Sequence, residues 1–479
     1  MAIKFSFGVD TCVGNVLIYG AGSAGKLLLT ALDYRKDINV LAFIDDKKEL
    51  VYQQIGKLKI HTPHTLPLLI KKYRPQSIIL ALPSIAQSRR EKILCYLEHY
   101  NLKIFFIPDL VELAHGYRQI DDLRTVKIED LIDRDPAPPN IPLQTKITQD
   151  KFILVSGAGG LVGAGLCHQL IKLKPKRLVL LDCNENALNT IFSELQDRIE
   201  DTIELKASLG TIEDYDSIKH TMKKFSINIV YHTAAYKIVP IGSHNIISFV
   251  ENNILGTANI VKAAAESKVE RFIFASSAHA SQPKDLIGAT ERFSELIVQS
   301  FVETYPETNF SSIRLGQTMS SSLIPLFHEQ LNHGEHFSTT EPDCLCYPMT
   351  ISEVVQLIIQ ASSMSKSGDL FTLNMGKSKH IVDLTYRLMH LMGTTTKDKK
   401  HLKETRFDRT NTDKINTIFC TEGNAKTEND KIMYVHEKKL PSDQVQKSLK
   451  YITDAVEKFD AIAVNHVLKE IIQVYVPPS

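Results

Sequence analysis

The stretch Phe152-Ile153-Leu154-Val155-Ser156-Gly157-Ala158-Gly159-Gly160-Leu161-Val162-Gly163 decides the fold, because an apolar run leads directly into a glycine-rich loop. The run Phe152–Val155 predicts a buried parallel strand, and the apolar spacing after the loop predicts a helix. In this order, backbone N–H groups at the start of the helix can approach an anion closely. We therefore predict that the pyrophosphate of a dinucleotide binds to Gly157, Gly160 and Gly163, and that Leu161 and Val162 also contact the cofactor.

An acid ends the next predicted strand, Leu178-Val179-Leu180-Leu181-Asp182. A carboxylate at this place accepts a hydrogen bond from the adenosine ribose of a dinucleotide. Asp182 is therefore predicted to bind the ribose, which favours NAD over NADP as the cofactor.

The N-terminal part of the chain repeats this pattern. Asn15–Tyr19 predicts a strand, Gly20–Gly25 a glycine loop, and Val40–Ile44 a second strand followed by Asp45. Asp45 follows Gly20 at the same spacing at which Asp182 follows Gly157. The first loop either binds a nucleotide of its own or serves as a structural turn between strand and helix.

Strands and helices alternate after both glycine loops, which indicates parallel sheets. The fold class predicted is α/β, with two tandem Rossmann-like doubly wound parallel sheets, the second carrying a smaller C-terminal α+β portion. Further strands are predicted at Ser77–Ala81, Lys103–Ile107, Asn228–His232, Arg271–Ala275 and Phe310–Leu315. Helices are predicted at Thr65–Tyr73, Ser88–His99, Tyr215–Phe225, Val250–Ser267 and Thr290–Thr304.

A proline-rich segment, Asp135–Asn140, cannot join either sheet and marks a boundary. We predict an N-terminal Rossmann-like domain over residues 1–134, a linker over 135–150 and an NAD-binding domain over 151–376. Residues 377–479 are expected to form a substrate or lid portion, with a polar loop at Thr394–Lys431 and a final helical segment from Ser442 to Val474.

Composition narrows the class of protein. The chain has 479 residues, a net charge of +1 and 23% charged residues, which does not indicate a nucleic-acid partner. No apolar run reaches the length of a membrane span, so a cytoplasmic protein without a span in this chain is expected. The seven cysteines are scattered, and Cys344 and Cys346 lie too close together for ordinary zinc spacing, so no metal is predicted.

Two further segments carry a specific resemblance, Tyr231-His232-Thr233-Ala234-Ala235-Tyr236-Lys237-Ile238-Val239-Pro240 and Glu251-Asn252-Asn253-Ile254-Leu255-Gly256-Thr257. With the glycine loop and Asn374-Met375-Gly376, they resemble the bacterial nucleotide-sugar 4,6-dehydratases of capsule, O-antigen and flagellin-glycan synthesis. That family belongs to the extended short-chain dehydrogenase/reductases. Many larger members carry transmembrane helices ahead of the first domain, so this chain resembles their cytoplasmic part.

The resemblance implies a role in polysaccharide biosynthesis with NAD as the cofactor. NAD takes hydride from C4 of the sugar, water leaves across C5 and C6, and the hydride returns to C6. The substrate class implied is a UDP-sugar, a UDP-N-acetylhexosamine, and the implied assembly is a homo-oligomer. Residues lining the cofactor would be Ala234, Ala235 and Ser276, with Lys237 towards the nicotinamide end.

Several catalytic positions of the family are substituted here. The family's Thr-Asp-Lys segment reads Ser277-Ala278-His279, and the position of its second lysine reads Glu291. Dehydration needs groups that accept and donate protons near the nicotinamide. The candidates that remain are Ser277, His279 and Lys237.

Each candidate has an ordinary alternative. His279 is a general base or a half-exposed loop histidine, Lys237 a proton or phosphate partner or a solvated lysine, and Glu291 an exposed helical residue paired with a neighbour. Two functions follow. One is an NAD-dependent dehydratase or epimerase with altered acid–base residues; the other is a catalytically silent nucleotide-binding relative that acts as a scaffold or regulatory partner.

Overall fold

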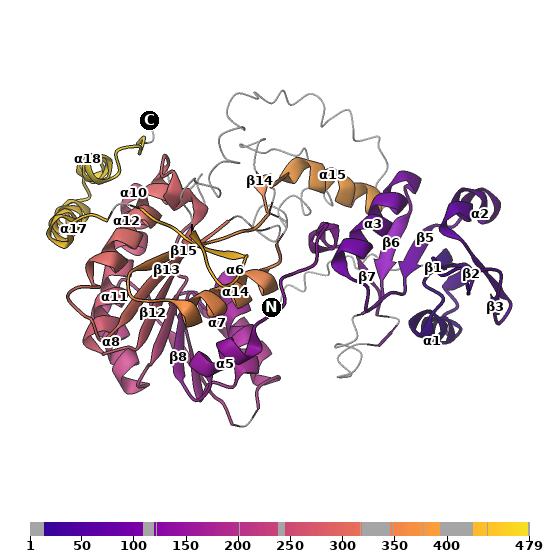
Figure 1. The fold of residues 1–479 in the computed structure, drawn as a ribbon, viewed down its shortest axis with the longest axis horizontal. Coiled ribbons are helices and arrows are strands. Elements are labelled where there is room, and N and C mark those ends of the chain that lie inside the picture. Colours follow the sequence, from indigo (N-terminus) through magenta and orange to yellow (C-terminus); the bar gives the residue numbers. More distant parts are fainter. Residues whose placement is uncertain are drawn as a thin grey trace, which may run out of the picture. The chain divides into compact units, whose positions relative to one another are not determined.

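A computed structural model describes residues 14–108, 119, 120, 122–200, 202–237, 245–316, 318, 345–347, 349–376, 378–392, 425–437 and 439–477. The chain forms two compact units. The first contains the described residues of Met1–Asp135 and Lys379–Arg409. The second contains those of Pro136–Ser321, Leu345–Ser378 and Thr410–Ser479. Each unit is built on one mainly parallel sheet (Figure 1), which confirms the predicted fold class.

The first unit has the strand order β3-β4-β2-β1-β5-β6-β7. Its parallel strands are β1 (Gly14–Tyr19), β2 (Ile38–Ile44), β4 (Leu58–His61), β5 (Ser77–Leu80) and β6 (Lys103–Phe106). Short antiparallel strands β3 (Gln54–Ile55) and β7 (Arg124–Thr125) lie at the edges. The helices are α1 (Ser23–Leu32), α2 (Leu66–Tyr73) and α3 (Gln87–Leu97). The strands and helices predicted for this part of the chain are confirmed.

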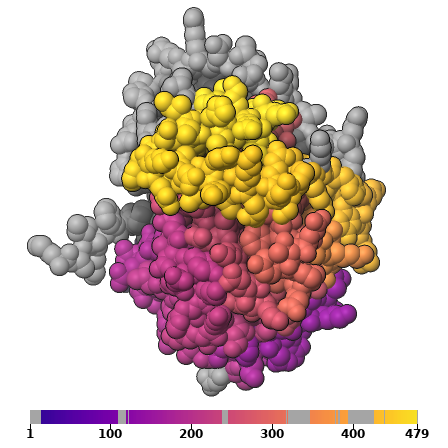
Figure 2. All heavy atoms as spheres, turned by 90° about the vertical axis from the view of Figure 1, so that its left-hand side faces the viewer, coloured from indigo at the N-terminus to yellow at the C-terminus, as the bar shows by residue number. Residues whose placement is uncertain are grey.

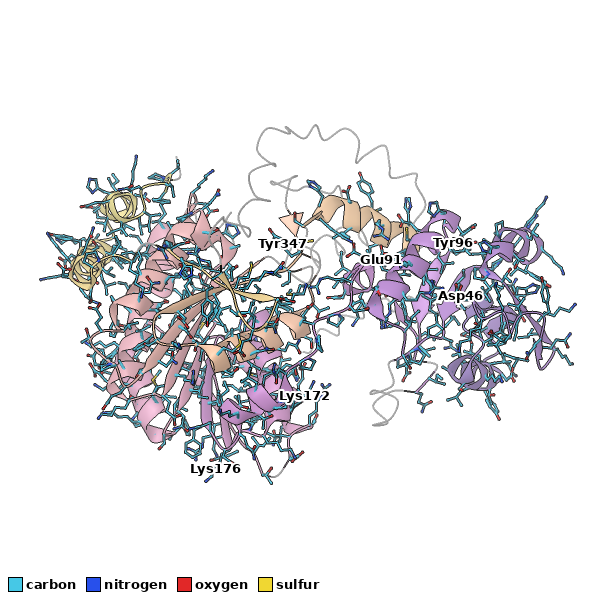
Figure 3. The ribbon with its side chains drawn as sticks, in the orientation of Figure 1. Asp46, Glu91, Tyr96, Lys172, Lys176 and Tyr347 are labelled. Carbon is cyan, nitrogen blue, oxygen red and sulfur yellow. The ribbon has the colours of Figure 1, made fainter. Side chains whose placement is uncertain are left out.

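A segment from the C-terminal part of the chain also belongs to the first unit. Helix α15 (Ile381–Leu391) carries Arg387, which lies 3.0 Å from a carboxylate oxygen of Glu91 and 2.9 Å from one of Glu98. Glu91 lies on α3 (Figure 3). The division of the chain therefore does not follow sequence order, because ion pairs hold α15 in a unit whose last strand, β7, ends at Thr125.

The segment predicted as a linker is only partly extended. After the prolines, Asn140 caps helix α5 (Ile141–Thr148) by accepting from the Leu143 N–H at 3.2 Å. Helix α14 (Ile351–Met364) then holds the segment, since Glu353 accepts from the Ala137 N–H and Gln356 donates to the Ala137 carbonyl. Residues after Pro136 thus pack as part of the second unit.

The second unit has the strand order β10-β9-β8-β11-β12-β13-β15-β18-β17. The parallel strands are β8 (Phe152–Ser156), β9 (Arg177–Asp182), β10 (Glu204–Leu209), β11 (Ile229–His232), β12 (Arg271–Ser277), β13 (Asn309–Leu315) and β15 (Asp369–Leu373). Strands β18 (Ile432–Tyr434) and β17 (Ala425–Lys426) are antiparallel additions. The order reverses between β8 and β11, and ligands bind at such a reversal, outside the carboxyl ends of the strands.

Buried side chains cover both faces of this sheet, since successive residues of a strand point to opposite faces. Leu154, Val179 and Val230 pack with helices α8 (Tyr215–Lys224), α11 (Thr257–Glu266) and α12 (Leu286–Ser300). Ile153, Leu178 and Ile229 pack on the other face with α6 (Leu161–Leu170), α7 (Glu185–Gln196) and α14. This is the doubly wound arrangement.

Two predicted helices have a different form. The helix expected at Val250–Ser267 starts earlier, as α10 (Ile246–Val250), and passes through a π-helical segment, Glu251–Gly256, before α11. The final helical segment is divided into α17 (Ser442–Glu457) and α18 (Ala461–Ile471).

The division of the final segment has a local cause. Phe459 takes a left-handed backbone, and Asp460 caps α18 by accepting from the Ala463 N–H. Figure 2 shows this C-terminal segment in yellow, and its apolar side chains pack with those of α12.

Most of the polar loop predicted at Thr394–Lys431 lies outside the described residues. In the part of the chain that is described, no helix is long and apolar enough to cross a membrane.

Candidate functional site

The glycine loop connects β8 to α6 as predicted, and its glycines are required by close backbone contacts. Gly157 has a φ of +70°, and a Cβ there would lie 2.8 Å from the Cα of Ala234. A Cβ at Gly163 would lie 2.0 Å from the carbonyl oxygen of Gly157. Helix α6 begins after Gly160 without a side-chain cap, so the positive end of its dipole is available to an anion.

Asp182 stands at the end of β9 and binds the loop itself. One carboxylate oxygen accepts from the Gly159 N–H at 2.8 Å, and the other accepts from the Asn184 N–H at 2.9 Å. Each oxygen of a carboxylate has a second lone pair, so the carboxylate retains capacity for a ribose hydroxyl.

The first unit repeats this geometry around Asp45. Its oxygens accept from the Ala21 N–H at 2.7 Å and the Lys47 N–H at 2.8 Å. A Cβ at Gly25 would lie 1.9 Å from the carbonyl oxygen of Gly20, as the Cβ at Gly163 would approach Gly157. The repeat seen in the sequence is therefore also a repeat of loop construction.

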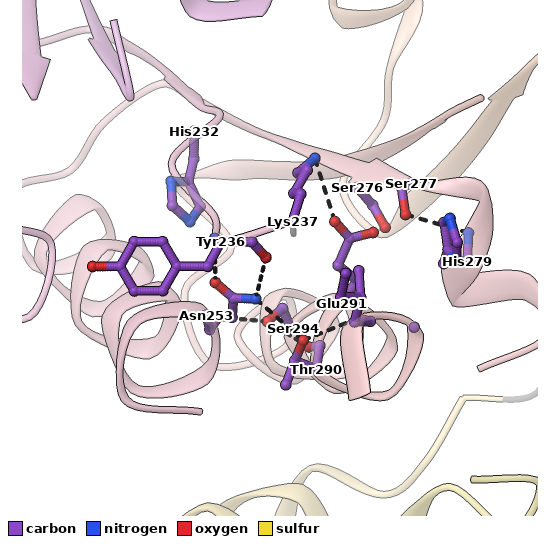
Figure 4. A network of polar contacts seen from close by, with 12 residues as sticks. His232, Tyr236, Lys237, Asn253, Ser276, Ser277, His279, Thr290, Glu291 and Ser294 are labelled. Atoms are coloured by element: carbon purple, nitrogen blue, oxygen red, sulfur yellow. Dashed lines mark hydrogen bonds and ion pairs between the residues drawn. The ribbon is translucent and has the colours of Figure 1, made fainter. Parts of the chain in front are cut away.

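Asn253 joins two parts of the site of the second unit through one buried side-chain amide. Its oxygen accepts from the Tyr236 N–H at 2.8 Å, and its nitrogen donates to the Tyr236 carbonyl at 3.0 Å and to the Thr290 hydroxyl at 3.2 Å. Asn253 lies in the π-helical segment, a rare form that is frequent at functional sites. The amide thus fixes the backbone before Lys237 and the residue before Glu291 (Figure 4).

Lys237 and Glu291 form an ion pair, with Lys237 Nζ 3.3 Å from Glu291 Oε1 (Figure 4). The Glu291 side chain is only 1% exposed, whereas that of Lys237 is 40% exposed. The expectation that Glu291 is exposed is therefore wrong, although its pairing with a neighbour is confirmed. Helix α12 is buried on nearly every side by the sheet and by α17 and α18, and periodicity alone does not reveal this.

Ser276, near the end of β12, forms a hydrogen bond to a buried network of charged side chains. Its hydroxyl donates to Glu295 at 2.7 Å, and Arg314 donates two hydrogen bonds to the same carboxylate. Arg292 and Glu437 complete the network. Burial alone would raise the pKa of Glu295, but the charges and hydrogen bonds of Arg314 and Arg292 outweigh it and hold the pKa below its usual range.

Ser277 and His279 lie at the start of the short helical turn after β12. The Ser277 hydroxyl accepts from the His279 N–H at 3.3 Å, and the His279 ring lies 3.3 Å from a carboxylate oxygen of Asp285. The side chain of His279 is 48% exposed, an exposure that fits both a general base and a loop histidine. Asp285 can orient the ring, as acids orient catalytic histidines.

His232 lies fully buried at the end of β11. Its ring nitrogens lie 2.8 Å from the Ser156 hydroxyl and 3.0 Å from the Thr257 hydroxyl. Burial, with a smaller contribution from the charge of Lys237, lowers the pKa of His232 to about 3. The ring is therefore neutral at neutral pH and ties β8, β11 and α11 together beneath the site.

This buried histidine predicts a pH dependence of stability. The unfolded side chain takes up a proton below about pH 6.5, whereas the folded one stays neutral down to about pH 3. Unfolding then binds an extra proton, which lowers the free energy of unfolding by about 1.4 kcal/mol for each pH unit of acidification in that window. Between pH 7 and pH 5.5, the free energy of unfolding measured by urea titration should fall by about 1 kcal/mol less in His232→Phe than in the wild type. An equal fall in the free energy of unfolding of both proteins would contradict the neutral state of His232 in the folded protein.

Sequence reasoning missed Asn253 and Glu295 as residues of the site. One signal was present for Glu295, because Thr290, Glu291, Ser294 and Glu295 form a polar stripe at helical spacing in a helix that is largely apolar elsewhere. Such a stripe in a buried helix indicates polar partners. Among the described residues, no group of three or more His, Cys, Asp or Glu side chains is placed to hold a metal ion.

The strand order and the glycine loop identify the second unit as a Rossmann-like domain. The chain belongs to the polysaccharide biosynthesis protein family, whose model matches residues 153–437, more than half of its length.

Individual relatives agree with this assignment. The capsular polysaccharide biosynthesis protein CapD of Staphylococcus aureus is 34% identical over 390 residues, 80% of this chain and 65% of CapD. The probable polysaccharide biosynthesis protein EpsC of Bacillus subtilis (strain 168) is 35% identical over 387 residues, 80% of this chain and 64% of EpsC. The chain thus spans slightly less than two thirds of the length of these relatives. Among solved structures, Pen from Bacillus thuringiensis is 29% identical over 51% of this chain and 75% of its own, with a TM-score of 0.48.

Proposed function

We propose that the second unit binds NAD and a UDP-N-acetylhexosamine, and that the chain serves polysaccharide biosynthesis as a nucleotide-binding scaffold or regulatory subunit. In this proposal it does not dehydrate the sugar by the route implied by its resemblance to the 4,6-dehydratases. This part of the proposal rests on one observation. At the position of the second lysine stands Glu291, whose buried carboxylate faces Lys237.

Binding of NAD is supported by the loop geometry. The pyrophosphate would lie against the backbone of Gly157–Gly163 at the start of α6, and the adenosine ribose against Asp182. The nicotinamide half would then extend across the strand reversal towards β11 and β12, where Ala234, Ala235 and Lys237 lie.

The proposed lack of dehydration is supported by the hydrogen bonds and the chemistry of the side chains at this site. Ser276 donates to Glu295, and Ala278 has no group that can transfer a proton. An ionised carboxylate at Glu291 accepts hydrogen bonds but cannot donate them.

A second candidate, a dehydratase or epimerase with altered acid–base residues, is favoured by one feature. His279 is paired with Asp285, and a histidine oriented by an acid is a general base of suitable pKa range. In that case Ser277 and His279 would handle the proton of the sugar hydroxyl.

The two candidates differ in a direct assay. Purified protein is incubated with NAD and UDP-N-acetylglucosamine, and the nucleotide sugar is followed by mass spectrometry. We expect no loss of water from the wild type and a measurable loss from the triple variant Ala278→Asp, His279→Lys, Glu291→Lys, because it regains proton-transfer groups. Turnover by the wild type that His279→Gln abolishes would overturn the proposal in favour of the second candidate.

A further inference from the structure

A network of four charged side chains lies near the carboxyl edge of the sheet in the second unit. Arg314 donates to both oxygens of Glu295, at 2.8 and 2.7 Å. It also donates to both oxygens of Glu437, to one of them at 3.0 Å. Arg292 bridges the same two acids, at 2.8 Å from Glu295 and 3.0 Å from Glu437. Two guanidinium groups therefore face two carboxylates, and the charges within the network balance.

Burial makes this balance of charge important. The side chains of Glu295 and Arg314 are 0% and 3% exposed, and that of Arg292 is 11% exposed. Charges act on one another more strongly in such a setting than in water, because the effective dielectric constant is lower. Loss of the charge of one member therefore leaves a surplus charge of the opposite sign near the edge of the sheet.

Glu437 reaches the network from a distant part of the chain. It follows β18, which lies two strands beyond β13 in the sheet. The other three members belong to α12 and β13, which pack with β12. Glu437 is also the most exposed of the four, at 28%. This acid thus supplies the second negative charge, which α12 and β13 do not provide to the network themselves.

The network contacts the segment that is predicted to line the cofactor. Ser276 donates to Glu295 at 2.7 Å, and Arg314 donates to the carbonyl of Ala280, in the turn that carries His279, at 3.4 Å. Ser276 and Arg314 are partners in register on neighbouring parallel strands, which lie about 4.8 Å apart. Ligands of this fold bind outside the carboxyl ends of these strands. A surplus charge on the network would therefore act on the cofactor over a short distance.

The two oxidation states of the cofactor differ in charge at one place. The oxidised nicotinamide ring carries a positive charge, whereas the reduced ring is neutral. A surplus positive charge nearby weakens the binding of NAD relative to that of NADH, and a surplus negative charge does the reverse. We propose that Glu437, by neutralising Arg314 and Arg292, sets the preference of the site between the oxidised and the reduced cofactor. Glu437 acts as a positioning residue, through the arginines, and the inference rests on the proposed binding of NAD.

Calorimetric titrations of the full chain with NAD and with NADH test the inference. The quantity compared is the ratio of the NAD affinity to the NADH affinity, because contacts common to both ligands cancel in it. The variants are Glu437→Gln, Arg292→Met and the two changes together. Glu428→Gln is the control, since Glu428 is an exposed acid between β17 and β18 and its change removes the same charge from the same segment.

We expect Glu437→Gln to lower this ratio at least about 5-fold, because one carboxylate then faces two guanidinium groups. Arg292→Met leaves a surplus negative charge and should raise the ratio by a similar factor. The double variant has a balanced network again, so its ratio should return to within about 2-fold of the wild-type value. Glu428→Gln should behave as the wild type. Merely structural contacts would not give this recovery, because the double variant has lost two members of the network.

A ratio that changes in neither single variant, or in the same direction in both, overturns the inference. Circular dichroism verifies the fold of each variant. If one single variant does not fold, an unchanged ratio in the other, or a change opposite to the expected one, overturns the inference. A wild type that binds neither NAD nor NADH would instead reject the proposed nucleotide binding.

Discussion

Arg314→Met is expected to lower the free energy of unfolding by about 3–5 kcal/mol, because it leaves a buried carboxylate without its main partner. Arg314 donates to Glu295 at 2.8 and 2.7 Å, and the two side chains are 3% and 0% exposed. Among the described residues, Arg292 would remain to neutralise Glu295 and Glu437. Urea unfolding at pH 7 measures the effect.

An exposed ion pair of the same unit provides the control. Lys151→Met removes the partner of Glu270, whose side chain is 47% exposed, and should cost less than about 1 kcal/mol. The double variant Arg314→Met, Glu295→Met should recover much of the stability lost in the single variant, because the uncompensated charge is gone. Equal costs for Arg314→Met and Lys151→Met would show that the buried network does not stabilise this end of the sheet.

Gly163→Ala is expected to weaken NAD binding at least about 100-fold, or about 2.7 kcal/mol. The new Cβ would lie 2.0 Å from the carbonyl oxygen of Gly157, so loop and helix must move apart where the pyrophosphate would bind. Calorimetric titration with NAD measures the affinity, and circular dichroism verifies the fold.

Gly210→Ala is the matched control for this change. A Cβ at Gly210 would meet its nearest neighbour at 3.7 Å, an ordinary contact, so NAD affinity should stay within about 2-fold of the wild type. If Gly163→Ala binds NAD as tightly as Gly210→Ala, the dinucleotide does not use this loop.

Much of the fold is readable in the sequence because it depends on local patterns. Short apolar runs such as Leu178–Leu181 predict buried strands, and Gly163 is required by a contact with Gly157 within one strand–loop–helix unit. The repeat of Gly20–Asp45 in Gly157–Asp182 likewise predicts the same loop construction, which both units show.

The remaining features depend on contacts between distant parts of the chain. The return of α15 to the first unit rests on Arg387 with Glu91 and Glu98, and no periodicity indicates which acid an arginine will meet. The burial of Glu291 and the pairing of Glu295 with Arg314 likewise result from contacts between distant parts of the chain. Sequence patterns report which side chains are apolar, whereas the partners of buried polar groups are set by the tertiary structure.

Titration of the wild-type chain with NAD tests the proposed function most directly. We predict saturable binding that Gly163→Ala weakens and Gly210→Ala does not, because the loop after β8 provides the pyrophosphate site. Absence of saturable binding at millimolar NAD, or binding that is insensitive to Gly163→Ala, would contradict the assignment of the second unit as an NAD-binding domain.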